Sequence, residues 1–556
     1  MKLFIVESPG KVKTIQKYLP DEFYVMASVG HIMEIPRNGL NINVDNGSFD
    51  IDVHTIQGKE KVVAEIKEKS KLADEIFICT DCDREGERIA FDVACVIEDE
   101  DKHKIKRAEF YEITKKAVNQ AVKNPRNINL NLVNSQVTRQ ILDRLIGYLV
   151  SPMVWDAVPG GKSAGRVQSV ALGLIAEREF QIREFVSEKF WDIPVEFKIG
   201  EEKVPGIVKT NLKNRFIDKD LALAAKKEIL ENDCIVSKVL SSKAKKIPYP
   251  PFDTASLQKA ASSVLNFSGK ETMEICQKLY EAGFQTYLRT DSFSVSDDAY
   301  NMCKEYISEK FTDKYLPKER RVYAKKTANS QEAHECIRPT HLGLGEPEEN
   351  DLTENERKLY DLVKSRFIAS QMQDMLSQKV AVDITSGSQI IGLEARTILF
   401  DGWSSVWKSD SKESFLPEIS EKQILELSNI EVKDHETRPP DRYNDGSLVA
   451  KMEKEGVGRP STWATLVDNL LSRGYVNKEG KNFYLTLIGE NIYLFLNKKF
   501  SDFFMNVGFT SSIEEKLDKI CQGEINKLEI LRDFYDLLNK AINKDRDNYL
   551  LSVFGG

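Results

Sequence analysis

Two β-rich stretches that bracket a long helical block most constrain the fold of this chain. Residues 191–245 and 377–432 alternate apolar and polar side chains, as strands with one buried face do. Residues 253–370 between them are mostly helical in pattern, and a proline-rich break at 248–252 precedes this block. The simplest arrangement is one β domain interrupted by a helical insertion, which would move as a lid on two hinges.

The first 125 residues have the pattern of an α/β domain. Residues 3–6 and 75–80 are short apolar strands, and segments of helical period alternate with them. This alternation predicts a mainly parallel sheet, in which functional sites lie at the carboxyl ends of the strands. Glu7 follows the first of these strands and Asp81 follows the second, so we expect both carboxylates at the same edge.

At 556 residues the chain is too long for one hydrophobic core. Residues 130–185 are strongly helical, and the segment after residue 438 contains a helix pair followed by a hairpin, as in a winged helix. We predict a multidomain protein with α/β, α and β parts: an α/β domain at 1–125, a helical, winged-helix-like DNA-binding domain at 126–187 and 433–556, a β-rich hinge domain at 188–247 and 373–432, and a helical domain at 248–372.

Composition excludes several classes of protein. The chain is 41% hydrophobic and 30% charged, and it has no apolar run of the roughly 18 residues that a membrane span needs. Without a signal peptide or membrane segment, we expect a cytoplasmic protein with no membrane partner. Among eight cysteines only Cys79 and Cys82 have C-x-x-C spacing, so no zinc site is predicted. No G-x-x-x-x-G-K-[ST] loop is present, which argues against an ATP-driven enzyme.

An acidic cluster follows the second strand. Asp81, Asp83 and Glu85 alternate along the chain, and Glu7 belongs to the same predicted sheet edge. Mg²⁺ prefers carboxylates and waters and leaves positions open for phosphate, so this cluster predicts a site for one or two Mg²⁺ ions. A solvated acidic turn is the alternative reading of the same residues.

A tyrosine beside an arginine suggests nucleophilic chemistry on a phosphodiester. Tyr287 lies two residues before Arg289, at a Thr-Asp-Ser turn. A free phenol has a pKa near 10 and needs help to attack phosphorus, which the Arg289 guanidinium and Lys11 could provide. A covalent tyrosyl ester would conserve the bond energy, so resealing would need no ATP. The alternative is a half-buried core tyrosine.

Two helix starts and one helix face carry candidate groups for binding a nucleic-acid backbone. Arg139 and Asp143 are one turn apart on an amphipathic helix. Residues 160–166 open a second long helix with small residues, whose free N–H groups suit a phosphate. Arg459 precedes two hydroxyl residues at a further helix start, where an ordinary helix cap is the alternative.

Two histidines are further candidates. His334 and Arg338 are four residues apart, so on a helix they could contact one phosphate. His31 lies in a Gly-His loop close to the first strand. For both histidines a solvated residue explains the spacing equally well.

These motifs resemble those of the type IA DNA topoisomerases, and within them the bacterial topoisomerase I branch. The resemblance runs in order along nearly all of the chain. It rests on residues 5–9, 81–87, 163–169, 279–292, 331–339 and 455–462. It implies a Toprim domain, a toroidal core with a helical lid, and Mg²⁺-dependent, ATP-independent cleavage of one DNA strand through a 5′-phosphotyrosine. Strand passage and religation would relax negatively supercoiled DNA, with single-stranded segments as the binding partner of a monomer.

The resemblance also implies residue roles. Tyr287 matches the nucleophile, Arg289 the neighbouring phosphate stabiliser, Glu7 the acid near the leaving 3′ hydroxyl, and Lys11 the lysine that stabilises transition-state charge. The Mg²⁺ ligands would be Glu7, Asp81, Asp83 and Glu85. The DNA-binding or supporting positions would be His31, Arg139, Asp143, Ser163, Gly165, Arg166, Gln168, His334 and Arg459. The cysteine pairs of the family's C-terminal zinc ribbons are not found in the sequence, so no zinc is expected.

Two other functions use the same residues. A Toprim nuclease or primase-like phosphotransferase would employ the acids without a covalent intermediate and would leave free ends. A DNA-binding protein without catalysis would not need Tyr287, Arg289 and the acids together. Trapping a protein–DNA adduct separates the three.

Overall fold

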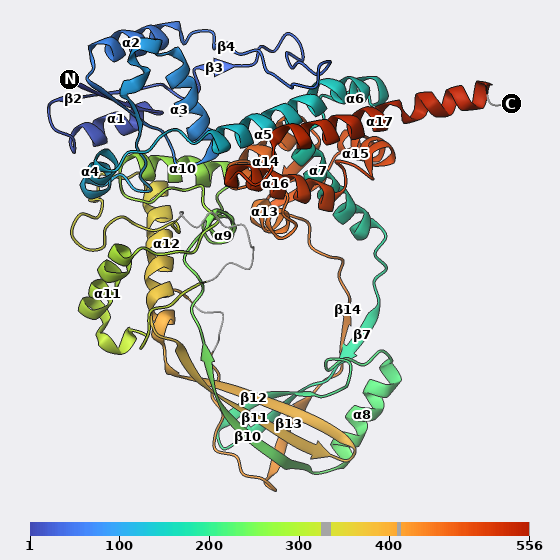
Figure 1. The fold of residues 1–556 in the computed structure, drawn as a ribbon. Helices are drawn as coiled ribbons and strands as arrows, with labels where there is room; N and C mark the ends of the chain where they lie inside the picture. The colour runs from blue at the N-terminus through green and yellow to red at the C-terminus, as the bar shows by residue number, and fades with distance from the viewer. Residues whose placement is uncertain (324–334, 409–412, 555–556) are drawn as a thin grey trace.

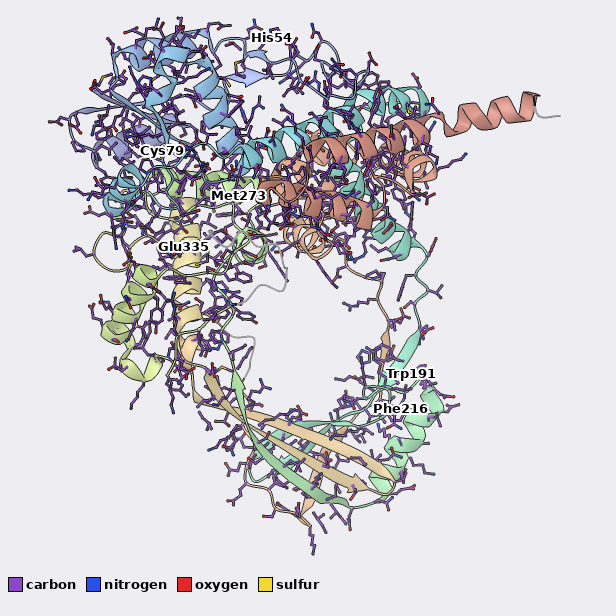
Figure 2. All side chains as sticks on the ribbon, in the orientation of Figure 1. His54, Cys79, Trp191, Phe216, Met273 and Glu335 are labelled. Carbon is purple, nitrogen blue, oxygen red and sulfur yellow. The ribbon has the colours of Figure 1, made fainter. Side chains whose placement is uncertain are left out.

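The chain closes into a ring (Figure 1). The structure is a computed structural model that describes residues 1–323, 335–408 and 413–554, with 544–554 described through their backbone alone. The N-terminal domain and a set of long helices form the top of the ring, the helical insertion one side, a β barrel the bottom and a two-stranded ribbon the other side. The side chains drawn in Figure 2 leave its centre open. The predicted toroidal, multidomain architecture is thus confirmed.

A four-stranded parallel sheet forms the N-terminal domain, as predicted. Its order is β2 (Phe23–Ala27), β1 (Lys2–Val6), β5 (Glu75–Cys79) and β6 (Ile105–Arg107), with a small ribbon of β3 (Met33–Glu34) and β4 (His54–Thr55) beside it. Helices α1 (Pro9–Gln16) and α4 (Lys115–Lys123) pack on the face that carries Phe4 and Phe77, and α2 (Glu60–Leu72) and α3 (Arg84–Val96) on the opposite face. Both faces are therefore covered, which explains the nearly uniform apolar character of β1.

Two distant segments build the long-helix region. The first contributes α5 (Leu130–Leu149), α6 (Ser151–Ala157) and α7 (Arg166–Arg183). The second contributes α13 (Asp445–Lys454), α14 (Trp463–Ser472), the hairpin β15 (Val476–Glu479) and β16 (Asn482–Leu485), α15 (Leu487–Phe500), α16 (Val507–Gln522) and α17 (Lys527–Phe554). Leu145, Leu448 and Leu517 belong to one hydrophobic core, so the two segments fold together. No helix in the described ranges is long and apolar enough to cross a membrane.

A closed six-stranded barrel takes strands from both β-rich stretches. Its order is β10 (Cys234–Lys246), β11 (Met375–Ser386), β12 (Gln389–Phe400), β9 (Glu202–Val208), β8 (Pro194–Ile199) and β13 (Ile424–Ile430). Helix α8 (Lys219–Glu231) packs against its core. The antiparallel pair β7 (Lys189–Asp192) and β14 (Lys433–Glu436) connects the barrel to the long helices.

The helical insertion leaves the barrel through β10 and returns through β11. It contains α9 (Thr254–Ala260), α10 (Gly269–Glu281), α11 (Asp297–Phe311) and α12 (Glu354–Gln371). One local prediction is wrong here. The segment from Glu335 to Arg338 is not helical, because Ile337 forms a β-bridge with Phe252. His334 lies outside the described residues.

Candidate active site and strand groove

Two loops at the carboxyl end of the parallel sheet bring Glu7, Lys11 and Asp81 together. Glu7 directly follows β1, and Asp81 lies two residues after the neighbouring β5. The Asp81 amide donates to Glu7 Oε2 at 3.2 Å. Lys11 is only 1% exposed, and its Nζ donates to Glu7 Oε1 at 3.3 Å and to Asp81 Oδ1. One ammonium group thus holds two carboxylates at the predicted sheet edge.

This buried triad carries two acids and one base. Burial raises the pKa of Asp81 to about 7, and Glu7 adds to this rise while Lys11 opposes it. Burial also disfavours ionised Glu7, but Lys11 and hydrogen bonds from Asp81 outweigh it and lower the Glu7 pKa. The two carboxylates likewise outweigh the burial of Lys11 and raise its pKa, so it is a permanent positive charge.

Asp83 connects the acidic loop to the tyrosine segment. It is the N-cap of α3, and its Oδ1 accepts from the Gly86 amide at 2.8 Å. Its Oδ2 accepts from the Tyr287 hydroxyl at 2.7 Å and lies 3.4 Å from Arg289 Nη1. The structure therefore brings the candidate nucleophile, the candidate phosphate stabiliser and one candidate metal ligand into direct contact.

Tyr287 is held as a neutral phenol in this closed arrangement. Its side chain is buried, and its ring meets the Tyr280 ring edge-on at 5.4 Å between centroids. The Lys11 ammonium lies 5.1 Å from the centre of the Tyr280 ring. Burial and the Asp83 carboxylate raise the pKa of Tyr287 well above its usual value, against the effect of Arg289. The hydroxyl can therefore donate its hydrogen bond to Asp83.

Glu85 and His31 form a second pair at the same edge. His31 Nε2 lies 3.4 Å from Glu85 Oε2, and its Nδ1 lies 3.8 Å from Asp92 Oδ2. Burial lowers the pKa of His31, but the Asp92 and Glu85 carboxylates outweigh it and raise it to about 9. Gln136 on α5 donates to Glu85 at 3.1 Å. His31 is therefore positively charged at neutral pH beside the candidate metal ligand.

A cavity of about 450 Å³ opens beside these residues. Its walls come from the acidic loops, the tyrosine segment and the start of α14, and they include Glu7, His31, Asp83, Glu85, Arg289, Ser461 and Thr462. Asp81 is not among its lining residues, because Lys11 holds it behind the wall. A second cavity of about 560 Å³ lies between α10 and α14 and shares Glu7, Arg289 and Ser461 with the first.

Polar contacts join the tyrosine segment to the Toprim-like domain, beside a cluster of apolar side chains that the two share. The Tyr287 amide donates to the Tyr111 carbonyl at 2.8 Å. Arg338 Nη2 lies 2.9 Å from Glu112 Oε2. Gly283 has φ +83°, and a Cβ there would lie 2.6 Å from the carbonyl oxygen of residue 113, so only glycine allows this approach.

The same set of contacts includes the start of α1. The Ser8 hydroxyl donates to Glu281 Oε1 at 2.5 Å, and the Thr14 hydroxyl donates to the Glu281 carbonyl at 3.1 Å. On the surface Lys116 pairs with Asp298. We call these contacts, together with those of Tyr111 and Glu112, the Toprim–insertion seam.

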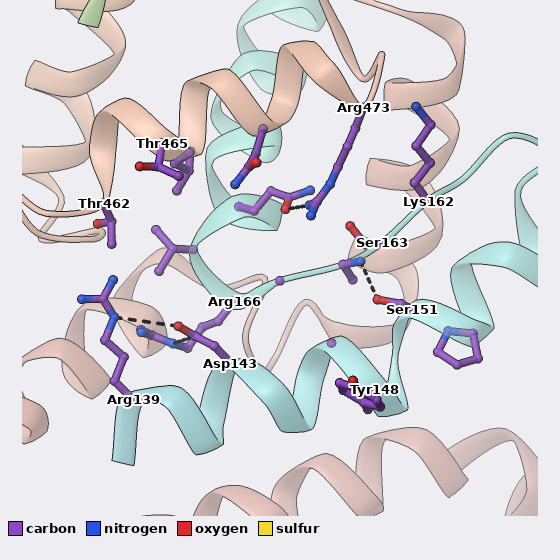
Figure 3. A pocket seen from close by; sticks show the side chains of 18 of the residues that line it. Arg139, Asp143, Tyr148, Ser151, Lys162, Ser163, Arg166, Thr462, Thr465 and Arg473 are labelled. Carbon is purple, nitrogen blue, oxygen red and sulfur yellow. Dashed lines mark hydrogen bonds and ion pairs between the residues drawn. The ribbon is translucent and has the colours of Figure 1, made fainter. Parts of the chain in front are cut away.

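A groove of about 810 Å³ runs between α5, α7 and α14 (Figure 3). Its basic lining residues are Arg37, Arg139, Lys162, Arg166 and Arg473. Asp143 lies between two of them, 3.8 Å from Arg139 Nε and accepting from Arg166 Nε at 3.4 Å. The aromatic Tyr148 and Trp155 also line it. A basic groove with aromatic side chains suits a single nucleic-acid strand.

The remaining candidates at the start of α7 also line this groove. The Ser163 amide donates to the Tyr475 hydroxyl at 2.7 Å, and the Ser163 carbonyl accepts from that hydroxyl at 2.9 Å. Gly165 is the N-cap of α7 and donates to Ser169. The Gln168 amide oxygen accepts from Arg473. The groove wall is therefore pre-ordered by contacts within the protein.

Arg459, the candidate at the start of α14, lies outside this groove. Its guanidinium donates to Asp518 Oδ2 at 2.6 Å. The hydroxyl residues after it, Ser461 and Thr462, do line the cavities. Sequence reasoning missed Arg37 and Arg473 in the groove, since neither belongs to a local motif and only tertiary packing places them there.

Comparison with known proteins decides the family. Residues 2–113 match the Toprim domain, and residues 127–532 match the family described as DNA topoisomerase. The chain is 38% identical over 584 residues to DNA topoisomerase 1 of Rickettsia bellii, covering 99% of this chain and 72% of that protein. The chain belongs to the bacterial DNA topoisomerase I family.

Other relatives agree along the whole chain. DNA topoisomerase 1 of Campylobacter jejuni is 38% identical, with 96% of this chain and 77% of that protein covered. DNA topoisomerase 1 of Pseudomonas aeruginosa is 36% identical, with 97% of this chain and 66% of that protein covered. The solved structure of full-length topoisomerase I from Thermotoga maritima superposes with a TM-score of 0.88 at 35% identity, covering 98% of this chain and 90% of that one.

The resemblance predicted from the motifs is therefore confirmed, and the nuclease or primase alternative is not favoured. The protein is a type IA DNA topoisomerase, an isomerase with DNA as its substrate, and it carries a Toprim domain.

Proposed function

We propose that this topoisomerase cuts one DNA strand through a covalent phosphotyrosine on Tyr287. The observation that carries the proposal is the 2.7 Å hydrogen bond from the Tyr287 hydroxyl to Asp83, beside Arg289 and the cavity of the acidic loops. The Tyr287 oxygen attacks phosphorus, the bond to the 3′ oxygen breaks, and the 5′ phosphate stays on the tyrosine. Reversal reseals the strand without ATP, because the ester keeps the bond energy.

The scheme assigns the phenolic proton and the positive charges near the phosphate to named residues. Asp83 already accepts the phenolic hydrogen bond, so it takes the proton as the nucleophile attacks, and the leaving 3′ oxygen takes a proton from solvent to become the 3′ hydroxyl. Arg289 and Lys11 provide fixed positive charge for the phosphate and the leaving oxygen. Glu7 lies beside Lys11, and we assign it the orientation of the leaving 3′ hydroxyl.

We further propose that Mg²⁺ binds through the predicted set Glu7, Asp81, Asp83 and Glu85. Three of these carboxylates line one cavity, which suits an ion that binds through one or two carboxylates, waters and a substrate phosphate. Within the described ranges no three His, Cys, Asp or Glu side chains are close enough together to hold a metal ion. In this closed form an ion would therefore need waters and a substrate phosphate as further ligands, or a shift of these carboxylates. When bound, the ion would neutralise charge on the phosphate. One or two ions fit this scheme.

The groove of about 810 Å³ is proposed to hold the uncut part of the strand. Arg139, Arg166 and Gln168 would contact its backbone, with Asp143 fixing the two arginines. Such a groove accepts a single strand rather than a duplex. Negatively supercoiled DNA offers unpaired stretches, so we propose that it is the preferred substrate and becomes relaxed.

The helical domain at 248–372 is proposed to act as the gate, with the barrel domain as its hinge. After cleavage it would move away from the Toprim domain with the 5′ phosphate attached, and a second strand would enter the ring. One chain contains every part of this scheme, so we propose that a monomer suffices.

The test is trapping on an oligonucleotide labelled on one side or the other of the break. A denaturing gel should show a protein adduct only with the label 3′ of the break, on the strand that begins with the 5′ phosphate. Tyr287→Phe should give neither adduct nor plasmid relaxation. Chelation of Mg²⁺ should block relaxation, and omission of ATP should not. Free ends without adduct, or relaxation by Tyr287→Phe, would refute the proposal.

A further inference from the structure

Helix α16 carries two carboxylates where the strand groove meets the acidic Toprim loop. Glu514 and Asp518 are one helical turn apart and therefore share a face of α16. The helix packs against α5 and α7, which form the groove. Neither acid belongs to the motifs singled out above.

We propose that Glu514 and Asp518 are positioning residues for DNA cleavage, which hold the arginines of the groove and of the acidic loop in one fixed arrangement. The inference rests on the proposed cleavage through Tyr287 and assigns that reaction two residues that do not touch the DNA.

Asp518 divides its two oxygens between two parts of the molecule. Its Oδ1 accepts from Arg84 Nη2 at 2.8 Å, and its Oδ2 accepts from Arg459 Nη2 at 2.6 Å. Arg84 is the residue between the candidate metal ligands Asp83 and Glu85. Arg459 begins the turn that leads into α14, whose Ser461 and Thr462 line the reaction cavity. One carboxylate therefore fixes the acidic loop relative to the opposite cavity wall.

Arg84 has a second contact that strengthens this connection. Its Nη1 donates to the Ser135 hydroxyl at 3.3 Å, and that hydroxyl donates to the carbonyl of Leu517 at 2.8 Å. Leu517 immediately precedes Asp518, so the acidic loop, α5 and α16 form one hydrogen-bonded unit.

Glu514 holds the groove wall. Its Oε1 accepts from Arg166 Nη2 at 2.6 Å, and both side chains are 0% exposed. Buried ion pairs contribute little net stability compared with apolar packing. Stability alone therefore does not explain why this pair is buried here. Within the described residues Arg166 Nη1 and Glu514 Oε2 have no hydrogen-bond partner. Arg166 belongs to the groove wall, but its unpaired nitrogen is buried, so a strand phosphate would reach this donor only if the wall shifts.

The charges fit this positioning role. Burial opposes the ionisation of Glu514, but Arg166, Arg139, Arg459 and Arg84 outweigh it and lower its pKa to about 2. Four guanidinium groups thus lie near enough to stabilise the Glu514 anion.

The test compares Asp518→Asn and Glu514→Gln with the matched control Glu515→Gln, an exposed acid on the same helix. Fluorescence anisotropy gives the Kd for a single-stranded oligonucleotide, and single-turnover trapping gives the cleavage rate at saturating DNA. Asp518→Asn should slow cleavage roughly 10- to 100-fold with little change in Kd, because a reacting group is misplaced. Glu514→Gln should raise the Kd about tenfold, the effect of one charge-assisted contact. The control should match the wild type.

A double-mutant comparison separates positioning from general stability. If Asp518 acts through Arg459, Asp518→Asn should add no further loss in an Arg459→Gln background. A full additional loss there would overturn the inference, as would binding and cleavage equal to the Glu515→Gln control. Asp518 is slightly exposed, so its variant carries the test even if Glu514→Gln fails to fold. Absence of any adduct with the wild type would instead refute the cleavage proposal.

Discussion

The two joints that hold the helical insertion in the ring are built differently. At the Toprim–insertion seam, contacts such as Ser8 with Glu281 and Glu112 with Arg338 are separate and polar. At the barrel, the insertion continues into β10 and β11, which pair from Ile235 opposite Thr385 to Lys246 opposite Met375. The first joint has no backbone ladder and combines polar contacts with a shared cluster of buried apolar side chains, whereas the second is a continuous ladder.

This difference indicates where the ring can open. Each polar contact of the seam is worth about 0.5–3 kcal/mol net and can be exchanged for water. Opening must also separate the apolar side chains that the Toprim domain and the insertion bury together. Breaking the ladder would expose many backbone groups and the apolar barrel core at once. This difference favours the proposal that the ring opens at the seam, while the barrel stays folded through each opening.

Tethering the seam should have the largest effect. Cysteines at Lys116 and Asp298, joined by a short thiol-reactive linker with an internal disulfide, would keep the seam closed. Plasmid relaxation should be abolished while oligonucleotide cleavage persists, because only strand passage needs opening. The exposed Cys95 and the half-buried Cys521 would first be replaced by serine.

Reduction of the linker provides the control for this experiment, since it should restore relaxation in the same sample. Undiminished relaxation by the tethered protein would show that the ring opens elsewhere.

Weakening the barrel should affect stability and leave the chemistry intact. Leu393 is 1% exposed in the barrel core, so Leu393→Ala should lower the free energy of unfolding by about 2–5 kcal/mol. Thermal unfolding measures this loss, and oligonucleotide cleavage at 25 °C should match the wild type. A loss of cleavage in the folded variant would mean that the barrel also shapes the active site.

Loss of a single ion pair at the seam should have a small, local effect on stability. Glu112→Gln removes the charge opposite Arg338 and should cost about 1 kcal/mol, so hydrogen exchange around Tyr287 should accelerate about fivefold. Glu394→Gln, which removes a more exposed ion pair with Lys379 on the barrel, is the control. If both variants accelerate hydrogen exchange around Tyr287 equally, the proposed difference between the seam and the barrel is wrong.

The smallest effect should come from pH. The pKa of His31 is raised above 6.5 to about 9, so its stabilising contribution is complete below pH 6.5 and is lost as pH rises through 9. Its partial exposure limits this contribution to about 1 kcal/mol. Thermal unfolding of His31→Gln should therefore decline less between pH 7 and pH 10 than that of the wild type. If stability falls equally with pH in both proteins, His31 does not stabilise the fold through its charge.

Sequence patterns predicted the elements whose signal is local. The parallel sheet followed from short apolar strands alternating with helices, and the contribution of Glu7 and Asp81 to one edge followed from the sheet. Patterns failed where tertiary contacts decide. Glu335 to Arg338 has a helical composition, but pairing of Ile337 with Phe252 holds it extended.

The candidate site shows the same division. The direct contact of Tyr287 with Asp83 joins two motifs that the sequence analysis singled out separately. The sequence could not predict that Asp81 stays out of the cavity, because this depends on its contact with Lys11 on α1. The attachment of Arg459 to Asp518 joins residues 59 positions apart, and no local spacing encodes it.

The neighbouring ends of β10 and β11 have a further consequence. Because Lys246 and Met375 are paired across the ladder, more than a hundred residues start and finish at a single point of the barrel. Such a cassette can be excised and replaced by a tight hairpin, or exchanged for that of a relative, without altering the connectivity of the remaining chain.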